Sequence, residues 1–456
     1  MELPKYIINE LKKKGADDVV ISSSKSYTKQ VRFSNNEINL NLSYSFDVFN
    51  IFASLKQRII STSLRDLSKK AADLTIKKIL ASAKNLPKNE DYKGIANGKF
   101  KYTNIEDNYD KNIDNVNPID IVEEAISLSI NKGVLKCAGV LFATKSEDKI
   151  FTSNDIIGED KKTHYYFSIR SMNSKDASGH SNAVSNVLSK LDYRNSAEES
   201  AEISKMSLNP KESPDGKFDV IFSPLAFAPL LKHTGDSASI YSIESGFSFF
   251  PKKLNERVAN TNVNLIDDGT YRNGSGSSRY DDEGHPRQRT TVVENGILKS
   301  FLHNTSSAIR YKTKSTGNAG LISPDPTNFI LMPGKLTKDE MIKNVKNGIL
   351  ITNIWYTRFN NYLTGEFSTI PRDGTFLIKN GEILYPISRL RVSDSLQRIY
   401  KNIIGLGKEL KQIESWEAES PTVLPYVFVK DVNITKPKWK LKDNFINQSL
   451  VVEKWW

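Results

Sequence analysis

The feature that most constrains the fold is a repeat within residues 1–207. A chain that carries one pattern twice is expected to fold into two similar units that pack on each other. Neither unit is long enough to bury both faces of its own sheet, so the two should form a single layered domain. Three sets of residues match at an offset of 118: Lys14-Gly15 with Lys132-Gly133, Val31–Ile38 with Lys149–Ile156, and Phe49 and Ile51 with Phe167 and Ile169.

Each copy contains the pattern of a helix, a group of strands and a second helix, and we place the copies at about 1–87 and 118–207. The apolar spacing predicts helices near 3–14 and 64–83 in the first copy, and over 119–130 and 195–206 in the second. The polar segment 88–117 predicts an exposed connection. Chance similarity of two α+β segments remains the alternative. Strand-like runs lie at 18–22, 28–33, 47–53, 140–144, 148–151 and 165–170.

A Pro-containing polar stretch at 208–217 predicts a linker, and the pattern changes after it. Two hairpins are expected around Asn295-Gly296 and Asn380-Gly381, because Asn-Gly favours the type I′ turn. We predict an α+β chain: an N-terminal α/β domain with an internal duplication, then a β-rich domain at 218–440 with antiparallel sheet and a few helices. The other expected elements are strands at 218–222, 262–266, 423–429 and 431–434, and helices that begin near 225, 338 and 394.

Composition excludes several classes of protein. The chain has 456 residues, 38% of them hydrophobic, which rules out wholesale disorder. Its one cysteine, Cys137, rules out an intramolecular disulfide and a thiolate-rich zinc site. The first ten residues have no signal-peptide pattern, and no apolar run is long enough to span a bilayer, so we expect a cytoplasmic protein without membrane association.

The net charge of +11 has two interpretations: a surface for nucleic acid, or an ordinary lysine-rich surface. The second is favoured, since acidic and basic residues are interspersed and no nucleic-acid motif occurs, so a nucleic-acid partner is not expected. The end of the chain is the exception, because Lys430 to Trp456 combines lysines with Trp439, Trp455 and Trp456. The tail at 441–456 is interpreted as a docking segment or an unstructured end.

Candidate site residues fall into two groups. Lys232, His233, Asp236 and Ser237 are close in sequence, but proximity in sequence does not establish the spatial alignment of a triad. Asp282, His285, Arg287 and Arg358 form the second group, as possible groove residues, and the two arginines are candidate binders of carboxylate or phosphate. His164 and His180 are far in sequence from acidic clusters. The glycine-rich stretch 272–278 lacks the end of a phosphate-binding loop and predicts a mobile loop.

The second half of the chain resembles the TldD/PmbA family of metalloproteases, also described as modulators of DNA gyrase. In the first half, Arg32–Ile38 is the best local match. No single motif is decisive, but their order over more than a hundred residues is specific. The matching segments are Leu254–Ala259, Ile266–Thr270, Asp281–Pro286, Val293–Leu302, Ser315–Asn318, Pro326–Phe329, Pro333-Gly334, Gly348–Ile351 and Leu363–Ser368.

The resemblance also implies what this chain lacks. The TldD branch has a His-Glu-x-x-x-His motif and a C-terminal cysteine as zinc ligands, with the Glu as general base. The corresponding stretch, Leu231–Ala238, lacks the His-Glu pair and the second histidine, and Glu419–Pro425 contains no cysteine. This is the pattern of the TldE (PmbA) branch, whose members pair with TldD to degrade or mature peptides. We therefore carry over no catalytic residue, no metal ligand and no cofactor, and expect zinc only in a TldD-like partner.

The resemblance predicts a TldE-like subunit that is inactive alone and contributes half of a peptide chamber. Its partner would be a TldD-like zinc-bearing subunit or a second copy, and its ligand an unfolded peptide held as an added strand. Lys232, His233, Asp236 and Ser237 would then line a degenerate cleft. The alternatives are an active peptidase with unconventional ligands (His233, Asp236 or His285) and a basic nucleic-acid-associated protein.

Overall fold

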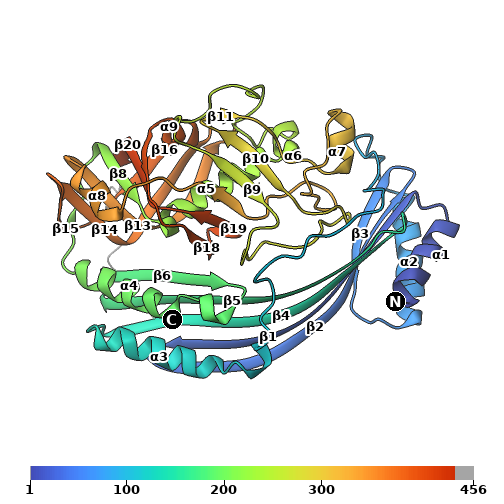
Figure 1. Ribbon diagram of the computed structural model, residues 1–456, viewed down its shortest axis with the longest axis horizontal. Coiled ribbons are helices and arrows are strands. Elements are labelled where there is room, and N and C mark those ends of the chain that lie inside the picture. Colours follow the sequence, from blue (N-terminus) through green and yellow to red (C-terminus); the bar gives the residue numbers. More distant parts are fainter. Residues whose placement is uncertain (1, 437–456) are drawn as a thin grey trace, which may run out of the picture.

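The structure, a computed structural model, describes residues 2–436. Its N-terminal half is one six-stranded antiparallel sheet with strand order β3-β2-β1-β4-β5-β6. The long strands curve beneath the C-terminal half (Figure 1). The elements are α1 (Glu2–Lys13), β1 (Asp18–Ser34), β2 (Glu37–Leu55), β3 (Arg58–Leu64), α2 (Lys69–Ala83), α3 (Pro118–Asn131), β4 (Lys136–Thr152), β5 (Ile157–Ser174), β6 (Ala177–Ser185) and α4 (Tyr193–Met206), with single 3-10 turns at Ile113–Asn115 and Leu188–Lys190.

The order helix, three strands, helix occurs twice in this half. β1 and β4 each have 17 residues, and they start 118 residues apart, at Asp18 and Lys136. They pair with each other in the middle of the sheet, so the two copies share one sheet. The four helices pack on one face of the sheet. At one end, α1 and α2 cover strand residues such as Ile21 of β1, and at the other end α3 and α4 cover strand residues such as Val31 of β1.

Several sequence-based boundaries in this half were wrong. Residues 18–22 and 28–33 belong to one strand, because the polar centre of β1 pairs on both sides, with β2 and β4. The runs at 140–144 and 148–151 are likewise one strand, β4. The second helix begins at Lys69, where Ser68 caps it, and not near Leu64, which ends β3. β6 was missed, because its small and polar residues carry no strand pattern.

The connection 88–117 is not merely exposed, as we had expected. Tyr92 and Asn108 are buried, and Asp110 accepts hydrogen bonds from the Tyr165 hydroxyl (3.1 Å) and the Leu188 N–H (3.0 Å). The connection also reaches the C-terminal half, where the Tyr102 hydroxyl donates to the Gly284 carbonyl at 2.9 Å. Its Asn, Asp and Tyr side chains therefore form a layer that joins the two halves.

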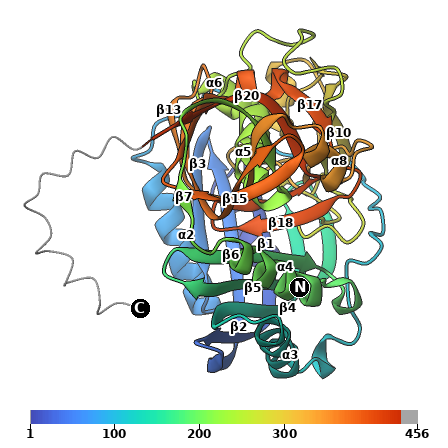
Figure 2. The ribbon, with the colours of Figure 1, turned by 90° about the vertical axis from the view of Figure 1, so that its left-hand side faces the viewer.

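The C-terminal half contains a closed ring of strands. The order β13-β8-β20-β16-β14 returns to β13 through the β13–β14 pairing, which makes a small barrel. β15, β7 and β17 extend it, and Figure 2 shows the barrel end-on above β6 and α4. The strands are β7 (Lys211–Glu212), β8 (Gly216–Phe222), β13 (Asn347–Asn361), β14 (Glu366–Lys379), β15 (Glu382–Ser388), β16 (Arg391–Ser395), β17 (Ile403–Leu406) and β20 (Val427–Thr435).

A second sheet, of order β11-β10-β9-β12-β19-β18, faces the barrel, and α5 (Pro224–Ala238) packs between them against β13 and β19. One shared core includes buried residues of α5, the barrel and this sheet. The remaining elements are β9 (Leu265–Asp268), β10 (Arg289–Glu294), β11 (Ile297–Leu298), β12 (Phe329–Leu331), β18 (Lys411–Ser415), β19 (Ala418–Leu424), α6 (Ile240–Glu244), α7 (Thr305–Arg310), α8 (Lys338–Lys343) and α9 (Leu396–Lys401).

The predicted fold class, α+β with antiparallel sheets and few helices, is confirmed. Both Asn-Gly hairpins form, with positive φ at Asn295 (47°), Gly296 (77°), Asn380 (50°) and Gly381 (83°). The expected strand 423–429 is divided, because β19 ends at Leu424 and Pro425 precedes β20. The Trp-containing tail at 441–456 lies outside the described residues. Within 2–436, no helix is both long and apolar enough to cross a membrane.

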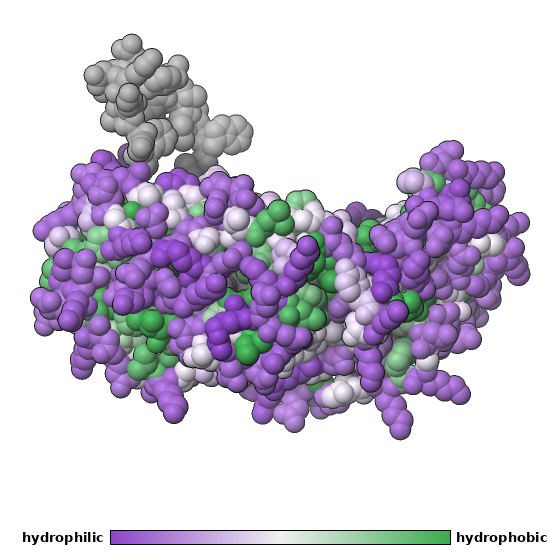
Figure 3. Space-filling model, turned by 90° about the horizontal axis from the view of Figure 1, so that it is seen from above, coloured by the Kyte–Doolittle hydropathy of each residue, from purple (hydrophilic) through white to green (hydrophobic). Residues whose placement is uncertain are grey.

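The face that carries α7 and the loops around β10 and β11 is mostly hydrophilic, with apolar side chains only in small patches (Figure 3). The two halves meet beneath it, where β18 lies beside β6. The Gln412 side chain donates to the Val184 carbonyl at 3.2 Å, and Lys411 pairs with Glu199 at 2.8 Å. The C-terminal half thus covers one outer edge of the N-terminal sheet.

Candidate functional site

α5 is a core helix with one accessible stretch. It starts with Ser223, whose hydroxyl caps the Ala226 N–H at 3.2 Å, and with Pro224 in its first turn. Nearly all of the helix is buried. Lys232, His233 and Asp236 are only half-buried, since they lie on the one side that neither sheet covers. The sequence therefore places three polar side chains on the exposed side of an otherwise apolar helix.

The four predicted cleft residues lie together. Lys232, His233, Asp236 and Ser237 line one cavity of about 320 Å³. The other lining residues come from α6 and the segment after it, and from the end of β13 and the turn that follows: Ser242, Phe247, Phe249, Phe359 and Tyr362. Sequence analysis did not identify these aromatic residues, because they are ten or more residues from the polar cluster, and Phe359 and Tyr362 lie more than a hundred residues after it.

The charges in the cleft are largely compensated. The Lys232 ammonium group lies 2.7 Å from the Asp236 carboxylate, and His233 Nδ1 lies 3.8 Å from it. Burial, and then the charges of Lys232 and Arg358, lower the pKa of His233 to about 3. Burial also raises the pKa of Asp236, which the Lys232 charge opposes. At neutral pH the imidazole is therefore uncharged and the lysine and aspartate form an ion pair.

Ser237 is not placed as a nucleophile. Its hydroxyl donates to the His233 carbonyl at 2.8 Å, the usual bond of a serine to the preceding turn of a helix. It makes no hydrogen bond to the His233 ring, so the base and nucleophile of a triad are not in contact. The cleft contains polar groups but no activated one.

The donor set does not fit a zinc ion. A hydrolytic zinc needs three protein ligands and an open position. Within residues 2–436, no three His, Cys, Asp or Glu side chains are close enough to share a metal. In the cleft, the Asp236 carboxylate is already paired with the Lys232 ammonium group. Among the four cleft residues, His233 is therefore the one side chain left to donate to a metal. β19, which includes most of the segment Glu419–Pro425, packs against α5, and the Glu419 charge acts on Asp236.

Aromatic rings form one wall of the cleft. The rings of Phe359 and Tyr362 are stacked, with centroids 5.4 Å apart, and Phe247 meets Tyr362 edge-on at 5.4 Å. His233 packs edge-on against Phe359 at 4.6 Å. Phe247 is 53% exposed and Tyr362 44% exposed, so this wall faces solvent. The arrangement offers an apolar surface beside the half-buried Lys232–Asp236 ion pair.

The four predicted groove residues are not brought together. Arg358 lies near the cleft, where its guanidinium stacks over the Tyr356 ring at 5.1 Å. Asp282, His285 and Arg287 lie in a separate turn, where Arg287 donates to the Gly317 carbonyl at 2.8 Å. Asp325, which sequence analysis missed, lies between the cleft and this turn. Burial raises the pKa of Asp325, and so do the charges of Asp236 in the cleft and Asp282 in the turn.

The glycine-rich stretch 272–278 is a packed loop, contrary to expectation. A Cβ on Gly274 would lie 2.5 Å from the Ser277 hydroxyl, and one on Gly276 would lie 2.6 Å from the Thr327 carbonyl. The Asn328 amide donates to Ser277 at 2.9 Å and holds the loop closed. The glycines therefore permit close packing between backbone segments and do not form a phosphate cradle.

His164 and His180 are not isolated from carboxylates in space. His164 Nε2 lies 3.0 Å from Glu414 of β18. His180 is half-buried beside Asn353, whose side-chain nitrogen lies 3.2 Å from its Nδ1, and desolvation lowers the pKa of His180 to about 4. Asn353 and Arg170 both bind Asp373, at 2.7 Å and 3.1 Å. These histidines belong to the junction of the two halves, which local sequence could not reveal.

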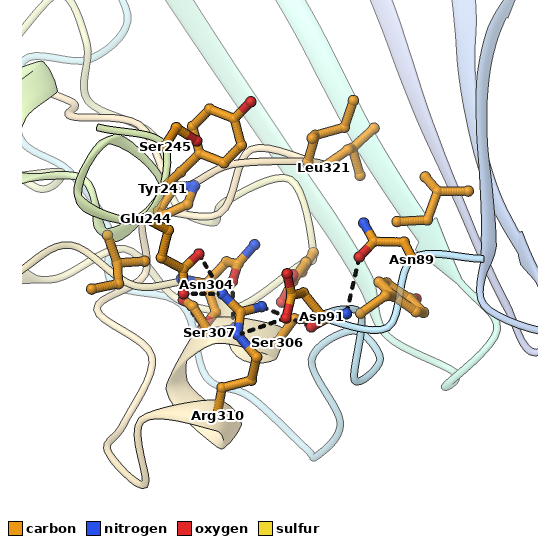
Figure 4. Close-up of a pocket in the computed structure, with 16 residues that line it drawn as sticks. Asn89, Asp91, Tyr241, Glu244, Ser245, Asn304, Ser306, Ser307, Arg310 and Leu321 are labelled. Atoms are coloured by element: carbon orange, nitrogen blue, oxygen red, sulfur yellow. Dashed lines mark hydrogen bonds and ion pairs between the residues drawn. The ribbon is translucent and has the colours of Figure 1, made fainter. Parts of the chain in front are cut away.

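A second cavity, of about 230 Å³, lies at the other end of this junction (Figure 4). Arg310 of α7 projects into it, forms a two-pronged ion pair with Glu244 of α6 and donates to the Asp91 carbonyl at 2.7 Å. Glu283 also lines it, and burial and the Asp281 charge raise the pKa of Glu283 to about 8. Its polar groups are mostly paired with one another, so we interpret it as part of the contact between the halves.

The C-terminal half of the chain is similar in sequence to known metallopeptidase domains. Residues 215–436 match the PmbA/TldA metallopeptidase C-terminal domain. A metalloprotease of Methanocaldococcus jannaschii is 32% identical over 232 residues, 49% of this chain and 50% of the relative. A metalloprotease TldD homolog of Buchnera aphidicola is 31% identical over 229 residues, 48% and 46% of the two chains. The aligned stretch thus spans about half the length of these relatives.

The fold extends the similarity to both halves. The crystal structure of TldE from Thermococcus kodakarensis superposes with a TM-score of 0.84 at 19% identity, over 95% of this chain and all of that one. At this identity the match shows a shared fold and nothing finer. The match over residues 215–436, with the relatives that align to the same part, assigns the C-terminal half of the chain to the TldD/PmbA family.

Proposed function

We propose that this chain is a non-catalytic, TldE-like member of the family, whose cleft on α5 holds a segment of unfolded peptide. It would act in the cytoplasm beside a zinc-bearing TldD-like subunit, or as a dimer of itself. The observation that carries the proposal is the cleft: an aromatic wall beside a Lys232–Asp236 ion pair, without a set of metal donors.

The position of the cleft supports the branch assignment. The resemblance places the zinc motif of the TldD branch on the stretch Leu231–Ala238, which lies in α5. The segment where that branch has its cysteine lies mostly in β19, which packs against α5. The branch assignment rests on these residues and not on overall identity, since the C-terminal half aligns with a TldD homolog.

The chemistry of the cleft suits an unfolded peptide. Such a chain presents apolar side chains that a folded protein buries, and the wall formed by Phe247, Phe359 and Tyr362 offers them a partly solvent-exposed apolar contact. Arg358 and the Lys232–Asp236 pair offer polar partners to main-chain amides and charged side chains. The same residues offer no group that would cleave the peptide.

Peptide binding tests the proposal. We would titrate a fluorescein-labelled ten-residue peptide with a central Phe into chelator-treated protein and follow fluorescence anisotropy. Phe359→Ala should weaken binding roughly tenfold, equivalent to about 1.4 kcal/mol. Tyr109→Ala, which removes an exposed aromatic side chain elsewhere, is the matched control. Equal binding by Phe359→Ala and wild type, or cleavage of the peptide by chelator-treated protein, would contradict the proposal.

The partner is tested separately. Co-purification of the untagged chain from native extract should recover a chain with the His-Glu-x-x-x-His motif, if the heterodimer is the working form. Recovery of this chain alone, in a monomeric state, would count against any complex.

A further inference from the structure

β13 contains a bulge in which its backbone is strained. Trp355 pairs with Ile370 of β14, and Arg358 pairs with Ser368, so three steps along β13 match two steps along β14. Inside the bulge, Tyr356 has a φ of 57°, a left-handed conformation that an aromatic residue rarely adopts. Bulges re-aim side chains, and strained residues cluster at functional sites. The bulge therefore points to a binding surface on this side of the barrel.

A carboxylate from the second sheet holds the bulge in place. Glu417 lies in the turn between β18 and β19, and its side chain accepts hydrogen bonds from the N–H groups of Tyr356 (3.1 Å) and Thr357 (2.9 Å). Trp416, the preceding residue in that turn, is 76% exposed, and Tyr356 is 53% exposed. The turn and the bulge thus present two aromatic side chains to solvent from adjoining segments.

Two arginines stack on the aromatic rings of the bulge. The Arg372 guanidinium lies over the Trp355 ring at 5.0 Å, and the Arg358 guanidinium lies over the Tyr356 ring at 5.1 Å. The two rings are 5.7 Å apart. Ile370 shares the face of β14 that carries Arg372, since residues two apart point to the same side of a strand. We call this surface the Trp-Arg patch, and its residues are Trp355, Tyr356, Arg358, Ile370, Arg372 and Trp416.

The arginines of the Trp-Arg patch have no carboxylate partner within residues 2–436. Burial and then the Arg170 charge lower the pKa of Arg372, and the Asp373 charge opposes them only in part. Asp373 is already paired with Arg170 at 3.1 Å, and Glu417 holds the bulge. An added carboxylate would therefore stabilise the patch. The arginines of this part of the chain that do form ion pairs are Arg170, Arg194, Arg272, Arg310 and Arg398.

We propose that the Trp-Arg patch binds an extended acidic segment of another polypeptide, in which carboxylates flank an apolar side chain. A guanidinium stacked on an aromatic ring keeps N–H groups free to bind a carboxylate. The carboxylates pair with Arg358 and Arg372, and the apolar side chain lies against Tyr356 and Trp416. Trp, Tyr and Arg are the residue types that dominate the binding energy of protein interfaces. The proposal does not depend on the role of the α5 cleft.

The charges favour a polypeptide over a nucleic acid. A nucleic acid carries a phosphate on every nucleotide and is held by a positively charged groove that follows its backbone. Here Glu417 and Asp373 lie close to the two arginines, so a continuous row of phosphates would also meet carboxylates. An acidic polypeptide can place its charges only where the arginines are.

A pair of peptides tests the charge preference. We would titrate a fluorescein-labelled ten-residue peptide with a central Glu-Phe-Glu, and its Gln-Phe-Gln counterpart, into the full chain and follow fluorescence anisotropy. Wild type should bind the Glu peptide roughly tenfold more tightly. Arg372→Gln should abolish this preference and leave binding of the Gln peptide unchanged. Arg65→Gln, which removes an exposed arginine of the N-terminal half, is the matched control and should keep the preference.

Two further variants separate the aromatic part of the patch from the α5 cleft. Trp416→Ala should weaken binding of the Glu peptide about tenfold, and it should leave thermal unfolding unchanged because the side chain is exposed. Phe359→Ala removes part of the aromatic wall of the cleft and should keep the preference for the Glu peptide. Arg358 is not used in the test, because its charge also acts on His233 in the cleft.

Three results would overturn the proposal. The first is equal binding of the two peptides by wild type. The second is a preference for the Glu peptide that Arg372→Gln retains, or Glu-peptide binding that Trp416→Ala leaves unchanged. The third is tighter binding of a fluorescein-labelled ten-nucleotide oligothymidylate than of the Glu peptide, if Arg372→Gln weakens it, since the patch would then be a nucleic-acid site.

Discussion

The two copies of the repeat differ most at their outer edges. β6, the last strand of the second copy, is almost wholly buried, because β18 and the loop at 272–278 cover it. In the first copy the counterpart of β6 is the short β3, which pairs only with Phe49–Leu55 of β2. The first part of β2 is therefore left at the edge, and it has no buried residue. A duplicated unit creates two edges, and the C-terminal half covers one of them.

Each copy contacts the C-terminal half beside a buried acid, and the pKa values of the two acids shift in opposite directions. Near β6, Asp373 binds Arg170, Ser178 and Asn353, and these partners keep its pKa below the usual value despite its burial. Near the first copy, Glu283 has a neighbouring carboxylate, Asp281, and burial raises its pKa to about 8. One contact therefore favours the ionised acid, and the other favours the protonated acid.

The largest expected effect comes from equivalent positions in the two copies. Phe167→Ala should lower the free energy of unfolding by about 3–5 kcal/mol, since the ring is fully buried against Phe33 and Tyr193. Phe49→Ala, 118 residues earlier, should cost less, because Phe49 retains some exposure. Urea unfolding of both variants measures the difference, and an equal cost would break the comparison.

Removal of the acid near β6 should have the next largest effect. Asp373→Ala leaves Arg170 without its partner and should cost about 3 kcal/mol. Because the pKa of Asp373 is lowered in the folded state, its contribution is present at neutral pH and is lost as the pH falls below its ordinary value of 3.8. Urea unfolding at pH 7 and at pH 3 measures this: the variant should differ clearly from wild type at pH 7 and much less at pH 3.

The opposite pH dependence is expected at Glu283. Its folded pKa of about 8 exceeds the ordinary 4.5, so the stability that protonation provides is complete below 4.5 and is lost as the pH rises toward 8. Glu283→Gln keeps a neutral acceptor for the Thr305 N–H. Relative to wild type, the variant should gain on the order of 3 kcal/mol between pH 5 and pH 8. A constant difference across that range would contradict this assignment.

The smallest effect is expected at the uncovered edge. Ser45→Lys should change the free energy of unfolding of the chain by less than about 0.5 kcal/mol, since the Ser45 side chain is exposed. Thermal unfolding at a protein concentration where the chain sediments as a monomer is the measurement. A loss of several kcal/mol would mean that this part of β2 is covered within the chain itself.

The sequence predicted the elements that have strong local patterns. The offset of 118 residues, the two Asn-Gly hairpins and the start of α5 all depend on local rules of spacing, turn geometry and capping. The boundaries inside the long strands were missed, because the polar centre of β1 is stabilised by pairing with β2 and β4, which are distant in sequence. β6 was missed because its small and polar residues carry no strand pattern.

The site was only partly predictable. Lys232, His233 and Asp236 share one side of a helix, so spacing brought them together. The aromatic wall depends on how the end of β13 folds over α5, and Asp325 depends on a loop held by Asp267, whose carboxylate accepts from Asn318 and Thr327. The place of His180 beside Asn353 follows from the contact between the halves.

The central claim is that the α5 cleft does not hold a catalytic zinc. The most direct measurement is zinc per chain by elemental mass spectrometry, on untagged protein purified without chelators. The account predicts far less than one zinc per chain. Zinc near one per chain that resists dialysis would contradict it, and would direct the search for ligands to His233, Asp236 and His285.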